Sequence, residues 1–268
     1  MVYYTPAFAD RFLQISNTEA SRREIEKYIA MTNYAFRNST LRGIKLALHC
    51  TEEIEIMDNE SDNGNDRLKA FGEAKGTTEE LLHTADMAIL LTNTQSDNQL
   101  RAGQAFVPRV GFTPDKPLGW VTGGWAPNFA HEIGHIFGAK HDRENAVNEN
   151  TGETRYGALL RGSERPASDG SRIGLRTLMA YKDEGNIYRQ GILHFSQDEN
   201  VEGASFRFGD SQNDNVLQIQ MSAKALAKKG DESCGCGDQN CFGKSALDEW
   251  ESKEGMIISL CHRRRLHF

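Results

Sequence analysis

The stretch that decides both fold and chemistry is His131-Glu132-Ile133-Gly134-His135-Ile136-Phe137-Gly138-Ala139-Lys140-His141-Asp142. On a helix, His131 and His135 project from one face one turn apart, so their imidazoles can reach one metal ion. A continuous helix would carry His141 too far along its axis, so the chain must turn first. Gly138 stands where this turn is needed, because glycine adopts the left-handed conformation that ends a helix at no steric cost. His141 can then return as the third ligand.

Three histidines leave the fourth position of a tetrahedral zinc ion open, which is typical of catalytic sites. Glu132 follows the first histidine at the edge of the same face, where it can take a proton from water and pass it to a leaving amine. We therefore predict one catalytic Zn²⁺ held by His131, His135 and His141, with Glu132 as general base and acid. The competing interpretation is a polar helix with satisfied core histidines.

The pattern H-E-x-x-H-x-x-G-x-x-H resembles the signature of the metzincin metallopeptidases, which also carry a methionine turn beneath the zinc. Thr177-Leu178-Met179-Ala180-Tyr181 resembles that turn, and Asp142 is similar to the aspartate of the reprolysin/adamalysin branch. The resemblance implies that Met179 lies beneath the ion without binding it. In the astacin and serralysin branches, a tyrosine at the position of Tyr181 helps to stabilise the oxyanion. Here it is either catalytic or a packing residue.

The resemblance covers residues 1 to about 229 and implies an α/β (α+β) domain. We expect a twisted, mixed sheet with packing helices, the zinc helix at the cleft and an irregular lower subdomain. The catalytic domain would span 1–229, with an upper part at 1–138 and a lower part at 139–229, and a small cysteine-containing extension at 230–268. The length of 268 residues, with 38% hydrophobic residues, fits one domain with an appendage.

Hydrophobic patterning predicts the individual elements. Strands are predicted at Val2–Phe8, Ile44–Ile56, Ala85–Leu91 and Gly103–Gly111. Helices are predicted from Ser21 onward, at Thr77–His83 and at Asn213–Lys228. Glu60–Lys75 and the segment between His141 and Met179 are interpreted as mostly surface connections with only local structure.

A proline at position 108 favours an edge position for the strand that begins at Gly103. In metzincins, a substrate peptide adds to the edge strand beside the zinc, and the resemblance gives this role to four residues. These are Gln104, Ala105, Phe106 and Val107. The alternative is a plain edge strand. Phe195 lies in a segment that resembles the border of the primed-side pocket.

The chain has five cysteines. Cys50 falls in a predicted strand and is interpreted as a buried free thiol. The others lie in the extension and favour two disulfides of a secreted appendage. The alternative is a second, structural zinc site completed by His262 or His267. These four are Cys234, Cys236, Cys241 and Cys261.

The net charge of −7 argues against nucleic acid or an anionic membrane as the main partner. No apolar run reaches membrane-spanning length. The start of the chain lacks the basic and apolar regions of a signal peptide, so either a targeting segment has been lost, or the protein is exported another way or stays inside. Of these we expect a secreted, extracellular protein. We expect a monomer, and no sequence feature supports a Ca²⁺ ion.

Together these observations predict a zinc-dependent endopeptidase acting on a protein or peptide substrate. One alternative is a narrowly specific processing protease or toxin. Another is a zinc-containing binding protein without catalysis. The intact Glu132 argues against the second alternative, because a purely structural zinc site needs no carboxylate there.

Overall fold

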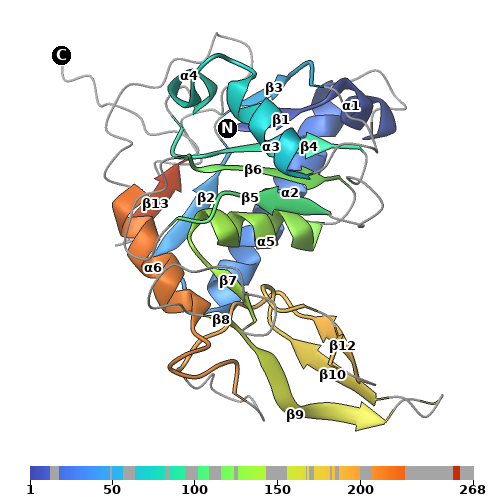
Figure 1. Ribbon diagram of the computed structural model, residues 1–268, viewed down its shortest axis with the longest axis vertical. Coiled ribbons are helices and arrows are strands. Elements are labelled where there is room, and N and C mark those ends of the chain that lie inside the picture. The colour runs from blue at the N-terminus through green and yellow to red at the C-terminus, as the bar shows by residue number, and fades with distance from the viewer. Residues whose placement is uncertain are drawn as a thin grey trace.

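A computed structural model describes most of the chain outside the C-terminal extension. The described residues are 1–12, 18–48, 50–56, 64–82, 85–93, 102–108, 116–123, 126–142, 156–166, 168, 172–181, 183–184, 187–199, 207–226 and 256–259. Figure 1 shows an upper body built on one sheet and a lower body with a second sheet, with α5 (Ala126–Ile136) between them.

The upper sheet has five strands in the order β3-β1-β4-β6-β5. The first four in this order run parallel, and β5 pairs with β6 in the antiparallel direction at the edge of the sheet. The mixed sheet agrees with the predicted α/β fold class. Its strands are β1 (Val2–Tyr4), β3 (Thr51–Glu53), β4 (Ala88–Thr92), β5 (Gly103–Ala105) and β6 (Leu118–Thr122).

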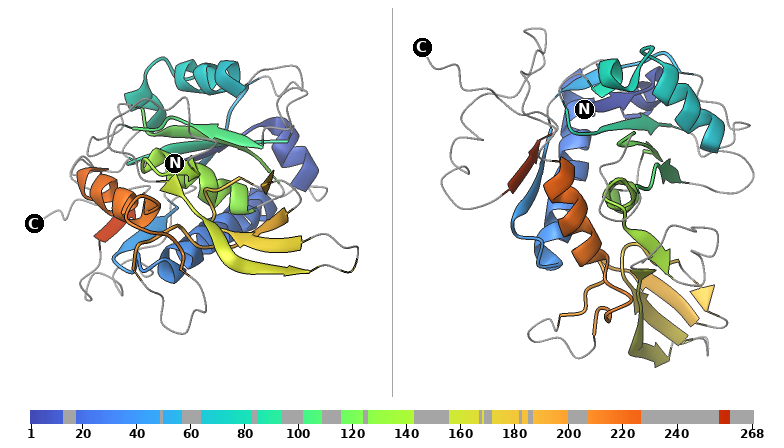
Figure 2. Two further views of the ribbon diagram at one scale, coloured as in Figure 1. Left: turned by 60° about the horizontal axis from the view of Figure 1, so that its bottom comes forward. Right: turned by 60° about the vertical axis from the view of Figure 1, so that its left-hand side comes forward.

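Helices cover both faces of this sheet, so its central strands β1, β4 and β6 are buried on both sides (Figure 2). Val2 and Tyr4 join a core cluster that contains Tyr28 and Phe129 from α2 and α5. Tyr3 points to the opposite face and packs edge-on against Phe71 of α3, with ring centroids 5.6 Å apart. The remaining helices of the upper body are α1 (Pro6–Phe12), α2 (Thr18–Asn38), α3 (Gly64–Glu73) and α4 (Thr78–Leu82).

The lower body follows α5 and contains a four-stranded sheet in the order β11-β12-β10-β9. A short parallel pair, β7 (Lys140–Asp142) and β8 (Tyr156–Gly157), connects α5 to this sheet. Near the end of the chain, α6 (Asn215–Leu226) is followed by β13 (Met256–Ser259), which pairs in parallel with β2 (Ile44–Ala47). The lower strands are β9 (Leu159–Pro166), β10 (Arg172–Arg176), β11 (Asp183–Glu184) and β12 (Ile187–Gly191).

Several predicted boundaries were wrong in the upper body. The first strand ends at Tyr4, because the Thr5 Oγ1 accepts a hydrogen bond from the Phe8 backbone N–H (3.2 Å) and caps α1. The predicted strand from Ile44 to Ile56 is two strands that pair with different partners, β13 and β1. The predicted surface connection before Lys75 contains α3, whose buried Leu68 and Phe71 are spaced as one helix face.

The lower body is more regular than predicted. The segment between His141 and Met179, interpreted as a surface connection, holds β8, β9 and β10. Its strands carry many polar residues, so their hydrophobic pattern is weak. They pair through backbone hydrogen bonds, which do not depend on the side chains. The sequence therefore gave no clear strand signal there.

The free-thiol interpretation of Cys50 was wrong, because this cysteine is disulfide-bonded. The predicted disulfides of Cys234, Cys236, Cys241 and Cys261, and the alternative zinc site with His262 or His267, lie outside the described residues. Within the described part of the chain, no helix is long and apolar enough to span a membrane.

Candidate metal centre

The helix α5 places two histidines by packing its opposite side into the core. Phe129, Ile133 and Ile136 are fully buried in the main apolar cluster. His131 and His135 project from the other side, with ring centroids 4.8 Å apart. The i, i+4 spacing therefore produces the predicted pair of ligands on one face.

Gly138 ends α5 and turns the chain. Its φ of +82° lies in the left-handed region, and its backbone N–H donates to the His135 carbonyl (2.8 Å). The next residue, Ala139, donates to the Gly134 carbonyl (2.9 Å). The chain then enters β7, which carries His141 back toward the helix, as predicted.

The three imidazoles meet at their Nε2 atoms. His141 Nε2 lies 3.2 Å from His131 Nε2 and 3.0 Å from His135 Nε2. Zinc–nitrogen bonds of about 2.0–2.1 Å would place the nitrogens of a tetrahedral site about 3.3–3.4 Å apart. The donor set therefore fits a zinc ion. Among the described residues, this triad is the only group of three or more His, Cys, Asp or Glu side chains that could hold an ion together.

Backbone carbonyls fix the orientation of two of these rings. His131 Nδ1 donates to the Leu178 carbonyl (2.9 Å), and His135 Nδ1 donates to the Ala139 carbonyl (2.8 Å). A neutral imidazole has one N–H, so the Nε2 of each ring carries a lone pair. The Nε2 lone pairs of His131 and His135 both point toward His141, and a cation bound between the three rings would accept them.

The surroundings favour the neutral, metal-binding form of the histidines. Burial is the main cause that lowers the pKa of His131 to about 4, and also that of His141 to about 3. Burial likewise lowers the pKa of His135. Neutral imidazoles at physiological pH are ready to coordinate a cation.

Glu132 lies beside the triad and is 5% exposed. Burial raises the pKa of its carboxyl group well above the ordinary value. Its Oε2 is buried and has no hydrogen-bond partner in the described part of the structure. A desolvated carboxylate is a stronger proton acceptor, as the predicted role requires.

Met179 is fully buried beneath α5. A Cβ atom added at Gly134 would lie 2.7 Å from the Met179 sulfur, and one added at Gly157 would lie 3.2 Å from the Met179 Cβ. Met179 is therefore packed between two glycines, one on the zinc helix and one on β8. Its predicted place beneath the metal site is consistent with this packing.

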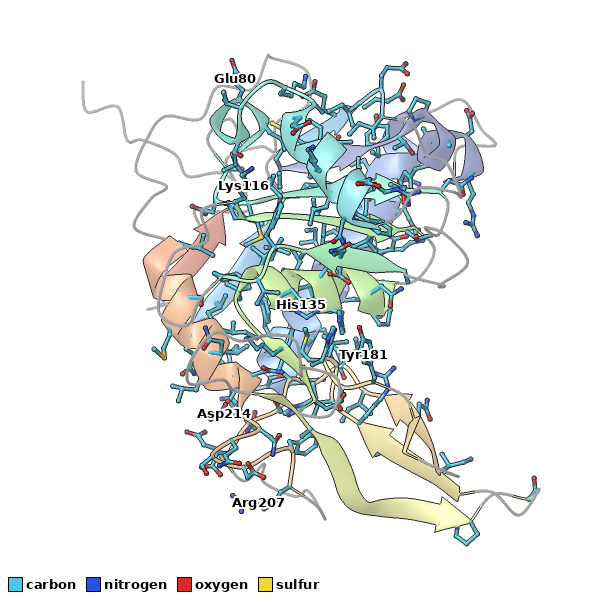
Figure 3. The ribbon with its side chains drawn as sticks, in the orientation of Figure 1. Glu80, Lys116, His135, Tyr181, Arg207 and Asp214 are labelled. Atoms are coloured by element: carbon cyan, nitrogen blue, oxygen red, sulfur yellow. The ribbon has the colours of Figure 1, made fainter. Side chains whose placement is uncertain are left out.

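Asp142 and Tyr181 join the third ligand to the methionine turn. The Tyr181 backbone N–H donates to the Asp142 carboxylate (2.8 Å). The Tyr181 ring lies 4.1 Å from the His141 ring, centroid to centroid, and is 47% exposed. Figure 3 shows Tyr181 below α5 near His135. Its exposed ring beside the triad leaves the catalytic role open as a proposal.

The predicted substrate residues divide into two groups. Gln104 and Ala105 lie in the edge strand β5, and Phe106 and Val107 follow it, with Phe106 37% exposed. Phe195 is completely buried and stacks near Phe36, with centroids 5.8 Å apart. We therefore assign Phe195 to the core that supports the zinc helix and not to the substrate-binding residues.

Sequence reasoning missed one residue that holds the third ligand. Asn215, at the start of α6, brackets Lys140 of β7: its Oδ1 accepts from the Lys140 backbone N–H and its Nδ2 donates to the Lys140 carbonyl, both at 3.0 Å. His141 is the next residue. No local pattern connects positions 140 and 215, so only the fold reveals this contact.

Comparison with known proteins gives a consistent result. Residues 1–196 match the family model Reprolysin_5, described as metallo-peptidase family M12. A curated relative, the peptidyl-Asp metalloendopeptidase of Stenotrophomonas maltophilia (strain K279a), is 26% identical over 210 residues, which are 75% of this chain and 46% of the relative. The chain thus spans less than half the length of this relative.

Two solved structures were compared with the fold. One, described as a chaperone-substrate complex, aligns with a TM-score of 0.54 at 15% identity over 84% of this chain and 33% of that chain, which shows a shared fold alone. The crystal structure of archaemetzincin from Methanopyrus kandleri aligns with a TM-score of 0.32 at 15% identity over 54% of this chain and 77% of that chain.

Proposed function

The chain belongs to metallopeptidase family M12, and on that premise we propose that it is a zinc-dependent endopeptidase whose active site is the histidine centre. The observation that carries the proposal is the orientation of His131 and His135. Their Nδ1 atoms donate hydrogen bonds to backbone carbonyls, which leaves the lone pair of each Nε2 to bind an ion together with His141. Zinc bound there would supply Lewis acidity, which polarises a carbonyl and acidifies water.

Glu132 is the proposed general base. Its carboxylate takes the proton of the attacking water as the new C–O bond forms at the scissile carbonyl. It then returns this proton to the amine nitrogen as the C–N bond breaks. The Tyr181 hydroxyl is the proposed donor to the oxyanion, because its ring lies beside His141 and is half-exposed.

The proposed substrate strand adds to β5. Phe106 N donates to the Leu118 carbonyl (3.0 Å), and Ala102 O accepts from Thr122 N (2.9 Å), so these two residues of the edge segment face β6. By the alternation of an antiparallel pair, the N–H and C=O groups of Gly103 and Ala105 face away from β6. These groups are available for backbone pairing with an extended peptide.

The test combines metal content with cleavage. Purified protein should contain about one zinc per chain and cleave a mixed peptide library, and a chelator should abolish cleavage until zinc is restored. Glu132→Gln should keep the zinc and lose turnover by about three orders of magnitude or more. Glu55→Gln, the same change at an exposed glutamate, should match the wild type.

Two results would contradict the proposal. Cleavage by Glu132→Gln at the wild-type rate would remove Glu132 as the base. Bound zinc without cleavage of any library peptide would favour the non-catalytic binding protein or a narrowly specific protease.

The substrate preference that we propose is for peptide bonds next to aspartate. A relative of this chain is a peptidyl-Asp metalloendopeptidase. In addition, the Arg176 guanidinium donates a hydrogen bond to the Ala180 carbonyl, next to Tyr181, so a positive charge lies beside the proposed site. Paired peptides with Asp or Asn at one position should differ at least tenfold in kcat/KM (~1.4 kcal/mol). Equal cleavage of the pair would exclude this preference.

Secretion is also a proposal, supported by the disulfide of Cys50, because disulfides persist in oxidising compartments. Peptide mapping of the unreduced protein from its native source would detect the disulfide and identify the cysteine that pairs with Cys50. The free Cys50 thiol in that material would contradict an extracellular location. The monomeric state is a further expectation, which light scattering can check.

A further inference from the structure

Gly103, the first residue of β5, lies directly against the Glu132 side chain. A Cβ atom added at Gly103 would stand 2.7 Å from Glu132 Oε1, 2.8 Å from its Cγ and 2.9 Å from its Cδ. All three distances are shorter than van der Waals contact allows. The carboxylate therefore occupies the space that any other residue at position 103 would fill.

Packing, rather than hydrogen bonding, fixes Glu132 in the described structure. The side chain is 5% exposed, and its buried Oε2 has no hydrogen-bond partner among the described residues. Gly134, two residues after Glu132 on α5, has different neighbours: a Cβ atom added there would meet Met179 and Phe195 in the core, each at 2.7 Å. Of these two glycines, only Gly103 would place a methyl group against the carboxylate.

We propose that Gly103 is a positioning residue for Glu132: its missing side chain lets the general base lie against the strand that binds substrate. The inference rests on the proposed function and adds a residue to its site. The same glycine would present its N–H and C=O to the substrate backbone, so substrate and carboxylate would be held by one residue.

A methyl group at this position should move the carboxylate at little cost to folding. The φ of Gly103 lies outside the left-handed region, so alanine can adopt the backbone conformation. The obstructing atoms, from Cγ to Oε1, all belong to the Glu132 side chain, which can move them away by rotating about its side-chain torsions. Rotation would displace the carboxylate by about 1 Å or more, which can reduce turnover by about a hundredfold.

The experiment compares zinc-loaded wild type, Gly103→Ala and Gly43→Ala. Nothing lies within 4 Å of a Cβ added at Gly43, so this control changes a glycine without a new contact. Gly103→Ala should keep its zinc and its Tm, lose about 10- to 100-fold in kcat and change less in KM. Gly43→Ala should match the wild type in all four quantities.

A double-mutant cycle separates positioning of Glu132 from other effects of the alanine. In the Glu132→Gln background, Gly103→Ala should cause no further loss of the residual rate. In the Glu132→Asp background, the shorter side chain should reduce the penalty. An equal loss in every background would show that Gly103 acts independently of Glu132 and would overturn the inference.

Crystal structures of the wild type and Gly103→Ala give a readout that does not depend on activity. The carboxylate should be displaced in the variant, with β5 unchanged. An unmoved carboxylate, a shifted β5 or a lowered Tm would overturn the inference. Failure of the proposed function is a separate outcome, seen as no zinc-dependent cleavage by the wild type.

Discussion

The two halves of the metal centre are held in place by different forces. His131 and His135 stand on α5, whose other side packs into the apolar core of the upper body. His141 stands on β7 in the lower body, where Asn215 brackets the neighbouring residue by two hydrogen bonds. The first half thus depends on apolar burial, and the second on polar contacts between distant segments.

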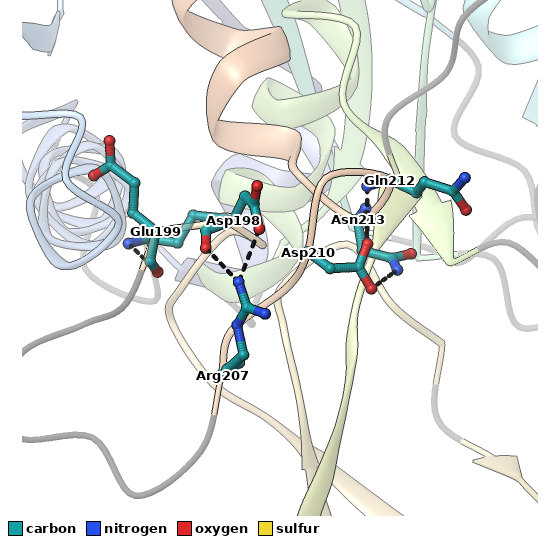
Figure 4. Close-up of polar contacts among 7 residues, drawn as sticks. Asp198, Glu199, Arg207, Asp210, Gln212 and Asn213 are labelled. Carbon is teal, nitrogen blue, oxygen red and sulfur yellow. Dashed lines mark hydrogen bonds and ion pairs between the residues drawn. The ribbon is translucent and has the colours of Figure 1, made fainter.

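Polar contacts recur throughout the lower body. Thr177 Oγ1 accepts from the Ala158 backbone N–H (2.8 Å) and so ties the methionine turn to the segment between β8 and β9. Figure 4 shows the chain that leads into α6, where the Asp210 carboxylate accepts from the backbone N–H groups of Gln212 (2.8 Å) and Asn213 (3.0 Å). Directional bonds of this kind place groups accurately while burying little apolar surface.

The difference suggests that stability and metal geometry can be separated by mutation. A change in the upper core should lower the free energy of unfolding first. A change in the polar contacts of the lower body should weaken zinc binding beyond its effect on stability. Matched pairs of residues in the two halves allow a direct test.

Phe129→Ala should have the largest effect on stability. Phe129 is fully buried and packs on Tyr28, with centroids 5.6 Å apart. Removing the ring should lower the free energy of unfolding by about 3–5 kcal/mol. Phe208→Ala in the lower body should cost less, because its apolar cluster contains one other buried residue, Ala158. Urea denaturation measures both, and equal losses would contradict the proposed difference.

Asn215→Ala and Asn33→Ala form the sharpest pair. Asn33 brackets Leu46 of β2 as Asn215 brackets Lys140, with bonds of 2.8 and 2.7 Å. Each change removes two buried hydrogen bonds to a strand backbone, so each should cost about 2–3 kcal/mol of stability. Zinc affinity should fall about 10- to 100-fold only for Asn215→Ala. Competition with a chromogenic chelator measures it, and equal affinities of the two variants would remove Asn215 from the metal site.

Gly138→Ala and Gly76→Ala test the turn that returns His141. Both glycines have positive φ, +82° and +88°, and a Cβ at either would meet the end of a flexible side chain, Gln218 or Glu80. Each alanine should cost about 1–2 kcal/mol. Only Gly138→Ala should also weaken zinc binding, because Gly138 precedes the strand of the third ligand. Unchanged zinc affinity in Gly138→Ala would show that the strand holds its place without the turn.

Tyr181→Phe should have the smallest effect. Tyr181 and Tyr34 are 47% and 50% exposed, so loss of either hydroxyl should leave stability unchanged. If Tyr181 donates to the oxyanion from its exposed position, kcat should fall about tenfold with KM nearly constant. Tyr34→Phe is the control. A Tyr181→Phe variant with wild-type kcat would make this residue a packing tyrosine.

Prediction from the sequence succeeded where the signal was local. The stripe of Phe129, Ile133 and Ile136 repeats along one helix, and β4 is a continuous apolar run. It failed in the lower body, where the strands carry polar residues, and at Cys50, because no local pattern shows whether a cysteine is disulfide-bonded. The boundary at Tyr4 was missed because the cap at Thr5 outweighs the pattern around it.

The sequence by itself determined the donor set and the proposed base, because the i, i+4 spacing, the glycine turn and the adjacent Glu132 are properties of one short segment. Only the tertiary structure decided that Asn215 holds the strand of His141, that Met179 lies between Gly134 and Gly157, and that Gly103 leaves room for the Glu132 carboxylate. These contacts join segments far apart in the chain. Single polar or glycine residues have no periodicity, so their partners become identifiable only when the chain has folded.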